Sequence, residues 1–327
     1  MQYLINPSLP LLIDDWPGNP IKGDQFQYPG RGFRPKWSNI AKMVFHSNPQ
    51  RREKKEDRWR PSVVRGHDYL QDKNDNWIVW LGHACFLIQL GGIRIITDPV
   101  FYDLPLIPRK VHLPFDPKVL QGIDYLLLSH DHRDHCDARS FKVLLQNNQV
   151  HILSSLRMGT VIQSWIGPTP LQEAGWYQTY QTQEEGLRIS YLPAQHWCRR
   201  GLTDFNLRLW GSFMIEYDGY CIYFGADSAS GPHFEQIGQL FQIDLALLGI
   251  GAYKPAFMMS DNHTSPSEAQ EAFQQLGAKK MIPMHYGTYD LSNEPISEPL
   301  RLIQECFQEK GQQSQLLRPG VNEVVEL

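Results

Sequence analysis

Histidine and aspartate are concentrated in one short stretch, His130-Asp131-His132-Arg133-Asp134-His135, which has the pattern H-x-H-x-D-H. The stretch follows an apolar run at residues 125–128 that has the composition of a buried strand. Because side chains alternate along extended backbone, His130 and His132 point the same way and can hold one cation. Asp134 and His135 follow after the chain turns and can reach a second cation. Imidazole and carboxylate groups at this density are typical of a metal site, and a polar loop with surface histidines is the alternative.

Three further candidate ligands each stand just after an apolar, strand-like run; they are His196, Asp227 and His285. Strands that end at one edge of a sheet would bring these residues to the H-x-H-x-D-H stretch. We therefore expect one metal site built from four distant parts of the chain.

The elements that must position these residues follow from apolar runs, turn residues and helix caps. Strands are expected at residues 77–81, 85–90, 93–97, 125–128, 188–192, 212–217, 220–224, 244–248 and 280–284. Helices are expected at about 138–148, 265–277 and 296–309. Asp137 can cap the first of these helices, and Pro266 suits the first turn of the second.

The first 75 residues differ from the rest in being rich in proline, glycine, aromatic and charged residues. Such turn-forming composition predicts an extended arm, and its aromatic content favours packing against the rest of the chain over disorder. We expect residues 1–75 to form this arm and residues 76–327 to form one domain.

Composition limits the class of protein. The chain has 327 residues, of which 42% are hydrophobic, and this is enough for a sizeable core. A net charge of -4 and a pI near 6.3 argue against nucleic acid as a partner. Five widely spaced cysteines without a C-x-x-C motif are typical of a reducing cytoplasm. Neither a signal peptide nor a transmembrane segment is expected.

The order of the candidate ligands resembles that of the metallo-β-lactamase superfamily. Between about residues 77 and 300, further blocks resemble the branch that hydrolyses N-acylphosphatidylethanolamines as a phospholipase D. These blocks include Trp80-Leu81-Gly82-His83-Ala84, Pro193-Ala194-Gln195-His196-Trp197, Gly249-Ile250-Gly251-Ala252-Tyr253 and His263-Thr264-Ser265-Pro266. The resemblance implies an α/β fold, an αββα sandwich of two mixed β-sheets flanked by helices, with a two-metal site where the sheets meet.

The resemblance also implies a ligand set. It assigns one metal ion to His130, His132 and His196, and the other to Asp134, His135 and His285, with Asp227 bridging the two. Zinc suits this imidazole-rich, thiolate-free set, although Mn²⁺ or Fe²⁺ would tolerate the carboxylates.

Other residues are expected around the metals. His263 matches a family histidine close to them and would act with Asp134 and Asp227 in catalysis by bonding a phosphoryl oxygen or the leaving alkoxide; the alternative is a helix-entry residue facing water. His83 is expected to contact the ligand residues without binding a metal itself, or to pack within the Gly82-His83 turn. Arg199 and Arg200 can pair with a phosphate or remain solvated.

The expected activity is that of a zinc-dependent phosphodiesterase. Two cations about 3.5–4 Å apart lower the pKa of a shared water to near 7, and the resulting bridging hydroxide attacks phosphorus in line. The products from an N-acylphosphatidylethanolamine would be an N-acylethanolamine and a phosphatidic acid. Alternatives are a lactonase, an esterase or a phosphodiesterase acting on a small soluble substrate, and a metal-binding scaffold without activity.

Expected partners are a phospholipid or another phosphodiester, with peripheral membrane contact and a homodimer as further options. A lipid substrate calls for an apolar groove, for which the candidates, otherwise packing residues, are Trp16, Phe26, Phe33, Trp37, Trp176, Phe257 and Met258. The branch has Gly-Asp-Thr-Gly around the bridging aspartate, whereas this chain has Ala226-Asp227-Ser228-Ala229. This departure is expected to reshape the pocket wall.

Overall fold

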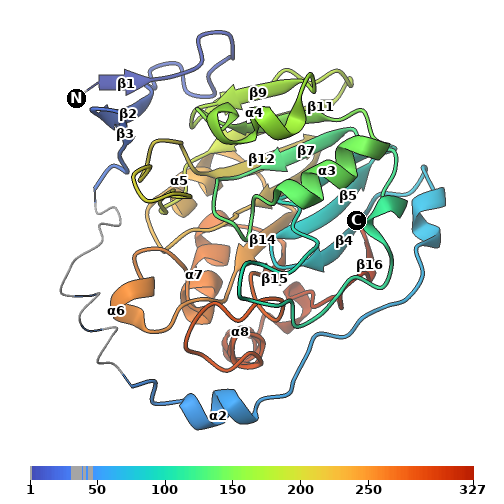
Figure 1. Cartoon of the computed structure of the whole chain (residues 1–327), viewed down its shortest axis with the longest axis vertical. Coiled ribbons are helices and arrows are strands. Elements are labelled where there is room, and N and C mark those ends of the chain that lie inside the picture. Colours follow the sequence, from blue (N-terminus) through green and yellow to red (C-terminus); the bar gives the residue numbers. More distant parts are fainter. Residues whose placement is uncertain (1, 31–38, 40–41, 43–46) are drawn as a thin grey trace.

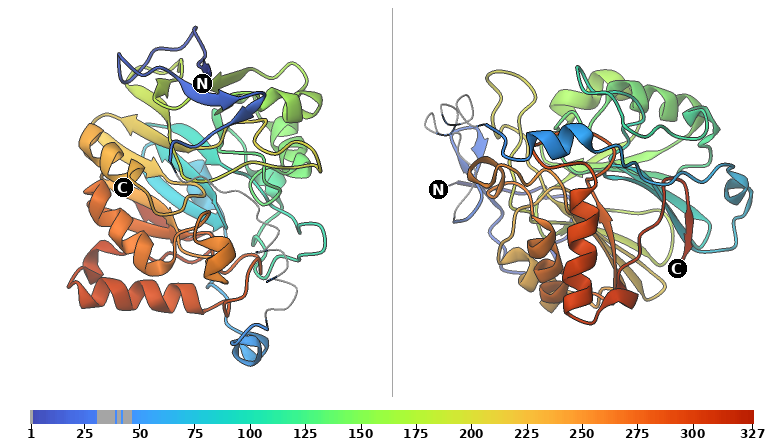
Figure 2. Two further views of the ribbon diagram at one scale, coloured as in Figure 1. Left: turned by 90° about the vertical axis from the view of Figure 1, so that its left-hand side faces the viewer. Right: turned by 90° about the horizontal axis from the view of Figure 1, so that it is seen from below.

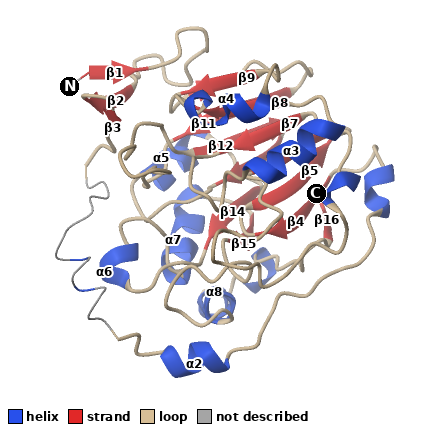
Figure 3. Cartoon of the chain, in the orientation of Figure 1, coloured by secondary structure: helices blue, strands red, loops and turns tan. Residues whose placement is uncertain are grey.

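The computed structural model describes residues 2–30, 39, 42 and 47–327. Two mixed β-sheets form its centre (Figures 1 and 3). The seven-stranded sheet has, in spatial order, β16 (Val324–Glu326), β4 (Trp77–Gly82), β5 (Cys85–Leu90), β6 (Ile93–Thr97), β7 (Tyr125–Leu128), β8 (His151–Ser155) and β9 (Leu171–Ala174). The six-stranded sheet has β10 (Gln178–Thr179), β11 (Leu187–Leu192), β12 (Ser212–Tyr217), β13 (Tyr220–Phe224), β14 (Leu245–Gly249) and β15 (Lys280–Met284).

Helices cover both outer faces, which makes the expected αββα sandwich. Figure 2 shows the green helices on one side of the sheets and the orange and red helices on the other. The first set is α3 (Ala138–Asn147) and α4 (Gly159–Ile166), and the second is α5 (His233–Leu240), α7 (Pro266–Leu276) and α8 (Glu298–Glu309). Outside residues 31–46, the remaining helical segments are short: α2 (Arg51–Glu56), α6 (Ala256–Met259), η1 (Asp68–Gln71), η2 (Pro117–Val119) and η3 (Gln313–Gln315).

The strands read as continuous apolar runs because both faces of each sheet are covered. Trp80 of β4 and Tyr191 of β11 belong to the core between the sheets, whereas Val79 of β4 packs with Phe141 of α3 on the outer face. Every residue of β4, β5, β6 and β7 is buried. The strands predicted at 85–90, 93–97, 125–128, 212–217, 220–224 and 280–284 are confirmed residue for residue.

Local hydrogen bonds start the helices where predicted. The side chain of Asp137 accepts from the backbone N–H of Ser140 at the start of α3. A capping box between Ser265 and Glu268, with Pro266 in the first turn, starts α7. The elements β8, α4, β9 and α5 are among those that were not predicted.

The prediction of a single sheet edge for the site was wrong. β7 belongs to the seven-stranded sheet, whereas β11, β13 and β15 belong to the six-stranded sheet. The loops after these strands meet where the two sheets approach each other, as the family resemblance implied.

The N-terminal segment adds a third, small sheet of β1 (Gln2–Leu4), β2 (Asn19–Lys22) and β3 (Gln25–Phe26). Phe26 is fully buried in the core shared with the two large sheets, and Leu11 pairs with Gln178 in a β-bridge. The described part of this segment therefore packs on the domain, while the boundary at residues 75 and 76 stays a prediction. Within the described ranges, no helix combines the length and apolarity needed to cross a bilayer.

Phe26→Ala tests how far the N-terminal segment belongs to the core. Removing a fully buried ring leaves a cavity, so the free energy of unfolding should fall by about 3–5 kcal/mol in chemical denaturation. Tyr3→Ala is the control, because the side chain of Tyr3 is 49% exposed and its loss should cost within about 0.5 kcal/mol. Equal denaturation midpoints for the two variants would contradict this assignment.

Candidate metal centre

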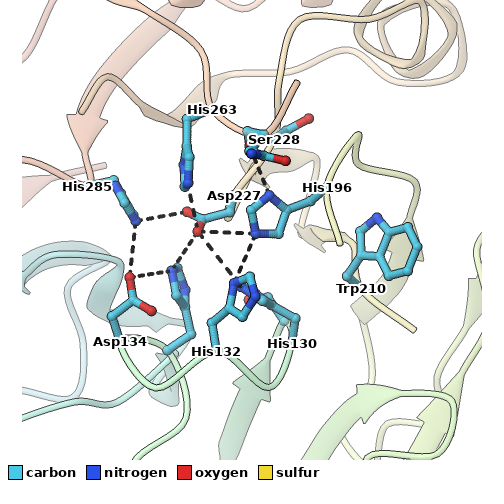
Figure 4. A network of polar contacts seen from close by, with 12 residues as sticks. His130, His132, Asp134, His196, Trp210, Asp227, Ser228, His263 and His285 are labelled. Carbon is cyan, nitrogen blue, oxygen red and sulfur yellow. Dashed lines mark hydrogen bonds and ion pairs between the residues drawn. The ribbon is translucent and has the colours of Figure 1, made fainter. Parts of the chain in front are cut away.

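The predicted ligands converge at the ends of four strands. The H-x-H-x-D-H stretch follows β7, and His196, Asp227 and His285 follow β11, β13 and β15. Figure 4 shows His130, His132, Asp134, His196 and His285 arranged around Asp227. The structure thus brings together all seven side chains that the sequence singled out.

The first group of ligand atoms is formed by three imidazoles and one carboxylate. Nδ1 of His132 lies 2.9 Å from Nε2 of His130 and 3.1 Å from Nε2 of His196. Asp227 Oδ2 lies 3.8 Å from the His130 nitrogen and 3.7 Å from the His196 nitrogen. One donor atom from each residue lies within 4.8 Å of the others, which is close enough to share a cation.

The second group lies on the other side of Asp227. His135 Nε2 is 3.1 Å from Asp227 Oδ2, and His285 Nε2 is 3.2 Å from Oδ1. Asp134 Oδ2 is 3.5 Å from His285 Nε2 and 3.8 Å from His135 Nε2. His83 joins this group, because its Nε2 lies 3.1 Å from Asp134 Oδ2. The carboxylate of Asp227 therefore faces both groups at once, as a bridging ligand must.

Burial and charge tune the side chains for metal binding. Burial lowers the pKa of His130 and His196 well below the ordinary value, so both rings are neutral and have a free lone pair. Burial opposes charge on Asp227, but His135 and His285 lower the pKa of its carboxyl well below the usual range. Burial also lowers the pKa of His285, but the carboxylates of Asp227 and Asp134 outweigh it and raise the value to about 9. Cations that bind here would displace such protons.

The residues present fit a pair of divalent cations. Nε2 of His135 and Nε2 of His285 are buried without a hydrogen-bond partner among the described residues, although both face Asp227. Buried polar atoms without partners are rare unless an ion or water satisfies them. No cysteine belongs to the candidate metal groups that the described residues form, and the buried Cys198 donates its Sγ–H to Asp131 at 2.8 Å.

Asp98 was missed in the sequence, although it orients one histidine of each group. His135 Nδ1 donates to Asp98 Oδ2 at 2.7 Å. His130 Nδ1 donates to Ser129 Oγ at 2.9 Å, and that hydroxyl donates to the same Asp98 oxygen at 2.6 Å. Both rings are thereby held with the Nε2 lone pair toward the metal site. The position of Asp98 could have identified it, because it directly follows the strand β6, and β6 pairs with β7 in the same sheet.

Backbone groups complete the orientation of the ligands. The carbonyl oxygen of Asn262 accepts from His196 Nδ1 at 2.9 Å. The carbonyl oxygen of His83 accepts from the backbone N–H of His285 at 3.2 Å. His83 adopts a φ of 56°, a conformation that directs the tight turn between β4 and β5. The predicted supporting role of His83 stays a prediction, because its ring nitrogen also lies within reach of a cation held by the second group.

Of the other predicted site residues, His263 lies in the site. Its Nδ1 is 3.9 Å from Asp227 Oδ2, and its ring stands between those of His196 and His285, with centroid distances of 5.2 and 5.0 Å (Figure 4). Its side chain is 14% exposed, so it faces the site and is not simply solvated.

The two arginines donate to backbone carbonyl oxygens, and their pairing with a phosphate stays a prediction. Arg200 donates to the backbone carbonyl oxygens of Asp131 and Cys136, both at 2.9 Å, and so supports the ligand loop. Arg199 is exposed and donates to the carbonyl oxygen of Gly201 at 2.8 Å.

The groove candidates divide into four sets. Phe26 and Trp176 are fully buried core residues, which agrees with the alternative that they serve in packing. Trp16 packs edge-on against Tyr177. Phe257 and Met258 lie in α6, whose last residue accepts a hydrogen bond from the backbone N–H of His263. Phe33 and Trp37 lie outside the described residues.

Known proteins share this fold and this sequence pattern. Residues 93–286 match the family described as a beta-lactamase superfamily domain. An N-acyl-phosphatidylethanolamine-hydrolyzing phospholipase D 1 of Caenorhabditis elegans is 30% identical over 92% of this chain and 91% of its own length. The mitochondrial N-acyl-phosphatidylethanolamine-hydrolyzing phospholipase D of Saccharomyces cerevisiae is 32% identical over 67% of this chain, which spans 49% of the yeast protein. A metallo hydrolase from the archaeon Ignicoccus hospitalis superposes with a TM-score of 0.59 at 20% identity, over 77% of this chain and 98% of that one.

The chain therefore belongs to the beta-lactamase superfamily, and its fold and site define a metal-dependent hydrolase of that superfamily.

Asp227→Asn tests the shared ligand. The amide keeps the shape but removes the charge that faces both groups, so both metals should be lost together, and elemental analysis after dialysis should find less than about half an equivalent per chain. Asp134→Asn is the matched control, because Asp134 belongs to only one group and should lose only one of the two metals. Two metals retained by the Asp227 variant would remove this residue as the bridge.

Proposed function

We propose that this chain is a zinc-dependent phosphodiesterase of the phospholipase D type. It hydrolyses N-acylphosphatidylethanolamines to an N-acylethanolamine and a phosphatidic acid. The observation that carries the proposal is the match to the worm relative, which extends over 92% of this chain and so includes most of the N-terminal segment as well as the site.

The ligand set suits this chemistry. When bound, two divalent cations supply a water of lowered pKa and neutralise charge on the phosphoryl oxygens. The three histidines His130, His132 and His196 would hold one cation, and Asp134, His135 and His285 the other. Asp227, which faces both groups, would be shared by the two cations, and a phosphodiester could then approach both at once.

His263 is the residue of this chain best placed to act on the substrate. Burial lowers the pKa of its ring to about 4, so it is neutral near pH 7 and carries a single N–H. A neutral imidazole beside Asp227 can donate to a phosphoryl oxygen, or to the leaving alkoxide as its charge develops.

Peripheral contact with a membrane belongs to the same proposal. Leu202 is 89% exposed and lies in the loop that follows His196, close in sequence to the exposed Arg199. An exposed leucine beside a cation suits the boundary between acyl chains and anionic headgroups. The described ranges show Phe257 and Met258 half-buried in α6, next to His263, where they can contact an acyl chain.

Purified protein loaded with Zn²⁺ and given N-acylphosphatidylethanolamine vesicles tests the function. Release of N-acylethanolamine and phosphatidic acid, followed by mass spectrometry, is the expected result. A panel of lactones, simple esters and small soluble phosphodiesters runs in parallel. Turnover of a panel member without any N-acylethanolamine release, in protein shown to hold both metals, would replace the lipid assignment by a lactonase, esterase or small-substrate phosphodiesterase.

His263→Ala should keep both metals and lose turnover by about 10²–10⁴-fold, the usual contribution of a positioned proton donor. Steady-state kinetics and elemental analysis on the same sample separate the two effects. His112→Ala is the matched control, since this exposed histidine lies in the loop between β6 and β7 and should leave turnover unchanged. Normal turnover in the His263 variant would show that this residue is not catalytic.

A further inference from the structure

Ser228 connects the loops that carry three residues of the site. It directly follows Asp227 in the chain. Its Oγ accepts from the backbone N–H of Gln195, the neighbour of His196, at 2.9 Å. Its carbonyl oxygen accepts from the backbone N–H of Thr264, the neighbour of His263, at 2.9 Å. One residue therefore ties the ends of β11 and β13 to the segment before α7.

A buried histidine holds the Ser228 hydroxyl from the other side. Nε2 of His233, the first residue of α5, lies 2.9 Å from Ser228 Oγ. The His233 side chain is 1% exposed, and burial lowers its pKa to about 3, so the ring is neutral with one N–H. Gly231 packs against this ring so closely that an added Cβ would lie 2.9 Å from His233 Nδ1. The ring consequently has little room to turn away.

The N-terminal segment supplies the last member of this network. The hydroxyl of Tyr28 lies 3.3 Å from His233 Nδ1, and the Tyr28 ring stands edge-on to Trp176 at 5.9 Å. Trp176 donates through Nε1 to the carbonyl oxygen of Trp210 at 2.7 Å. Trp210 in turn donates to the carbonyl oxygen of Ala194, two residues before His196, at 2.9 Å. The segment thus reaches the His196 loop by two routes.

The balance of donors and acceptors defines the role of Ser228. The Ser228 hydroxyl donates its one proton to the carbonyl oxygen of Ala229 at 2.9 Å. Its oxygen therefore accepts from the Nε2–H of His233, and the remaining Nδ1 of that ring accepts from the Tyr28 hydroxyl. The backbone N–H of Gln195 also donates to Ser228 Oγ. Both lone pairs and the proton of Oγ are then used. Such a hydroxyl is a structural anchor and not a nucleophile activated by His233.

We propose that Ser228 is a positioning residue for the metal centre, held in place by His233 and Tyr28. Through this network, the N-terminal segment at residues 2–30 sets the affinity of the site for metal. The inference depends on the two-metal site of the proposed function and does not depend on its lipid substrate.

The Zn²⁺ affinity of the metal-free 327-residue chain, measured by competition with a chromophoric chelator, tests this role. Ser228→Ala should bind Zn²⁺ about 10–100-fold more weakly, as expected for residues that orient metal ligands. Ser228→Thr keeps the hydroxyl and should restore the affinity to within about threefold of the unaltered protein. A general loss of packing would not be reversed by the hydroxyl alone.

Tyr28→Phe removes one hydroxyl oxygen at the end of the network that is most distant from the metal site. It should weaken Zn²⁺ binding by about tenfold, the smallest effect expected for Ser228→Ala. Tyr180→Phe is the matched control, because it also removes a buried phenol oxygen, which donates to the carbonyl oxygen of Ser154 at 2.7 Å, and should leave the affinity unchanged. Combining Tyr28→Phe with Ser228→Ala should weaken binding no more than Ser228→Ala alone, since both act through one network.

Unchanged affinity in Ser228→Ala, failure of Ser228→Thr to restore it, or full additivity in the double variant would each overturn the inference. If circular dichroism shows that Ser228→Ala does not fold, the comparison of Zn²⁺ affinity between Tyr28→Phe and Tyr180→Phe tests the inference by itself. Equal affinities in these two variants would then overturn it. If the unaltered protein does not bind Zn²⁺, the proposed function is overturned as well. If the unaltered protein binds Zn²⁺ and the variants bind it equally well, only this inference is overturned.

Discussion

The carboxylate of Asp227 is the charge around which the site is built. It is buried, and imidazoles of both ligand groups surround its two oxygens within 4 Å. A buried anion of this kind is stable only when cations or donors compensate it. In this protein the compensating groups come from both large sheets. The same carboxylate that a pair of metal ions would share therefore also couples the two halves of the sandwich.

Orientation of the imidazoles depends on hydrogen bonds outside the ligand set. Asp98 holds His135 directly and His130 through Ser129, and the carbonyl oxygen of Asn262 holds His196. Each of these bonds occupies Nδ1 and leaves Nε2 free. A ring nitrogen that donates in this way has its other lone pair fixed in direction, which is the usual means of tuning metal affinity. Beneath the loop, Arg208 forms a buried ion pair with Asp131, between the first two ligands of the motif.

The N-terminal segment is more closely joined to the site than an arm laid on a surface would be. Phe26 lies in the main core, and Tyr28 contacts the ring of His233 behind Asp227. Lys254, in the loop after β14, pairs with Glu298 of α8 and also donates to Gln50, so a second contact joins residues before 75 to the domain. In physical terms, the segment completes the packing around loops that would otherwise be exposed and mobile.

Local patterns in the sequence determined most strands, the caps of α3 and α7, and the seven candidate ligands, because residue type and short-range periodicity decide these features. Only the tertiary structure decided which sheet each strand joins, since β7 and β14 are both short apolar runs but belong to different sheets. It also decided the roles of Asp98, Ser228 and Arg200. Each of them makes hydrogen bonds to distant parts of the chain, with a separation of 31 residues for Asp98 and Ser129 and of 69 for Arg200 and Asp131, and no local pattern encodes such distances. The histidine and aspartate residues thus predicted a metal site from the sequence, whereas the packing of two sheets and an N-terminal segment determined how those residues are held.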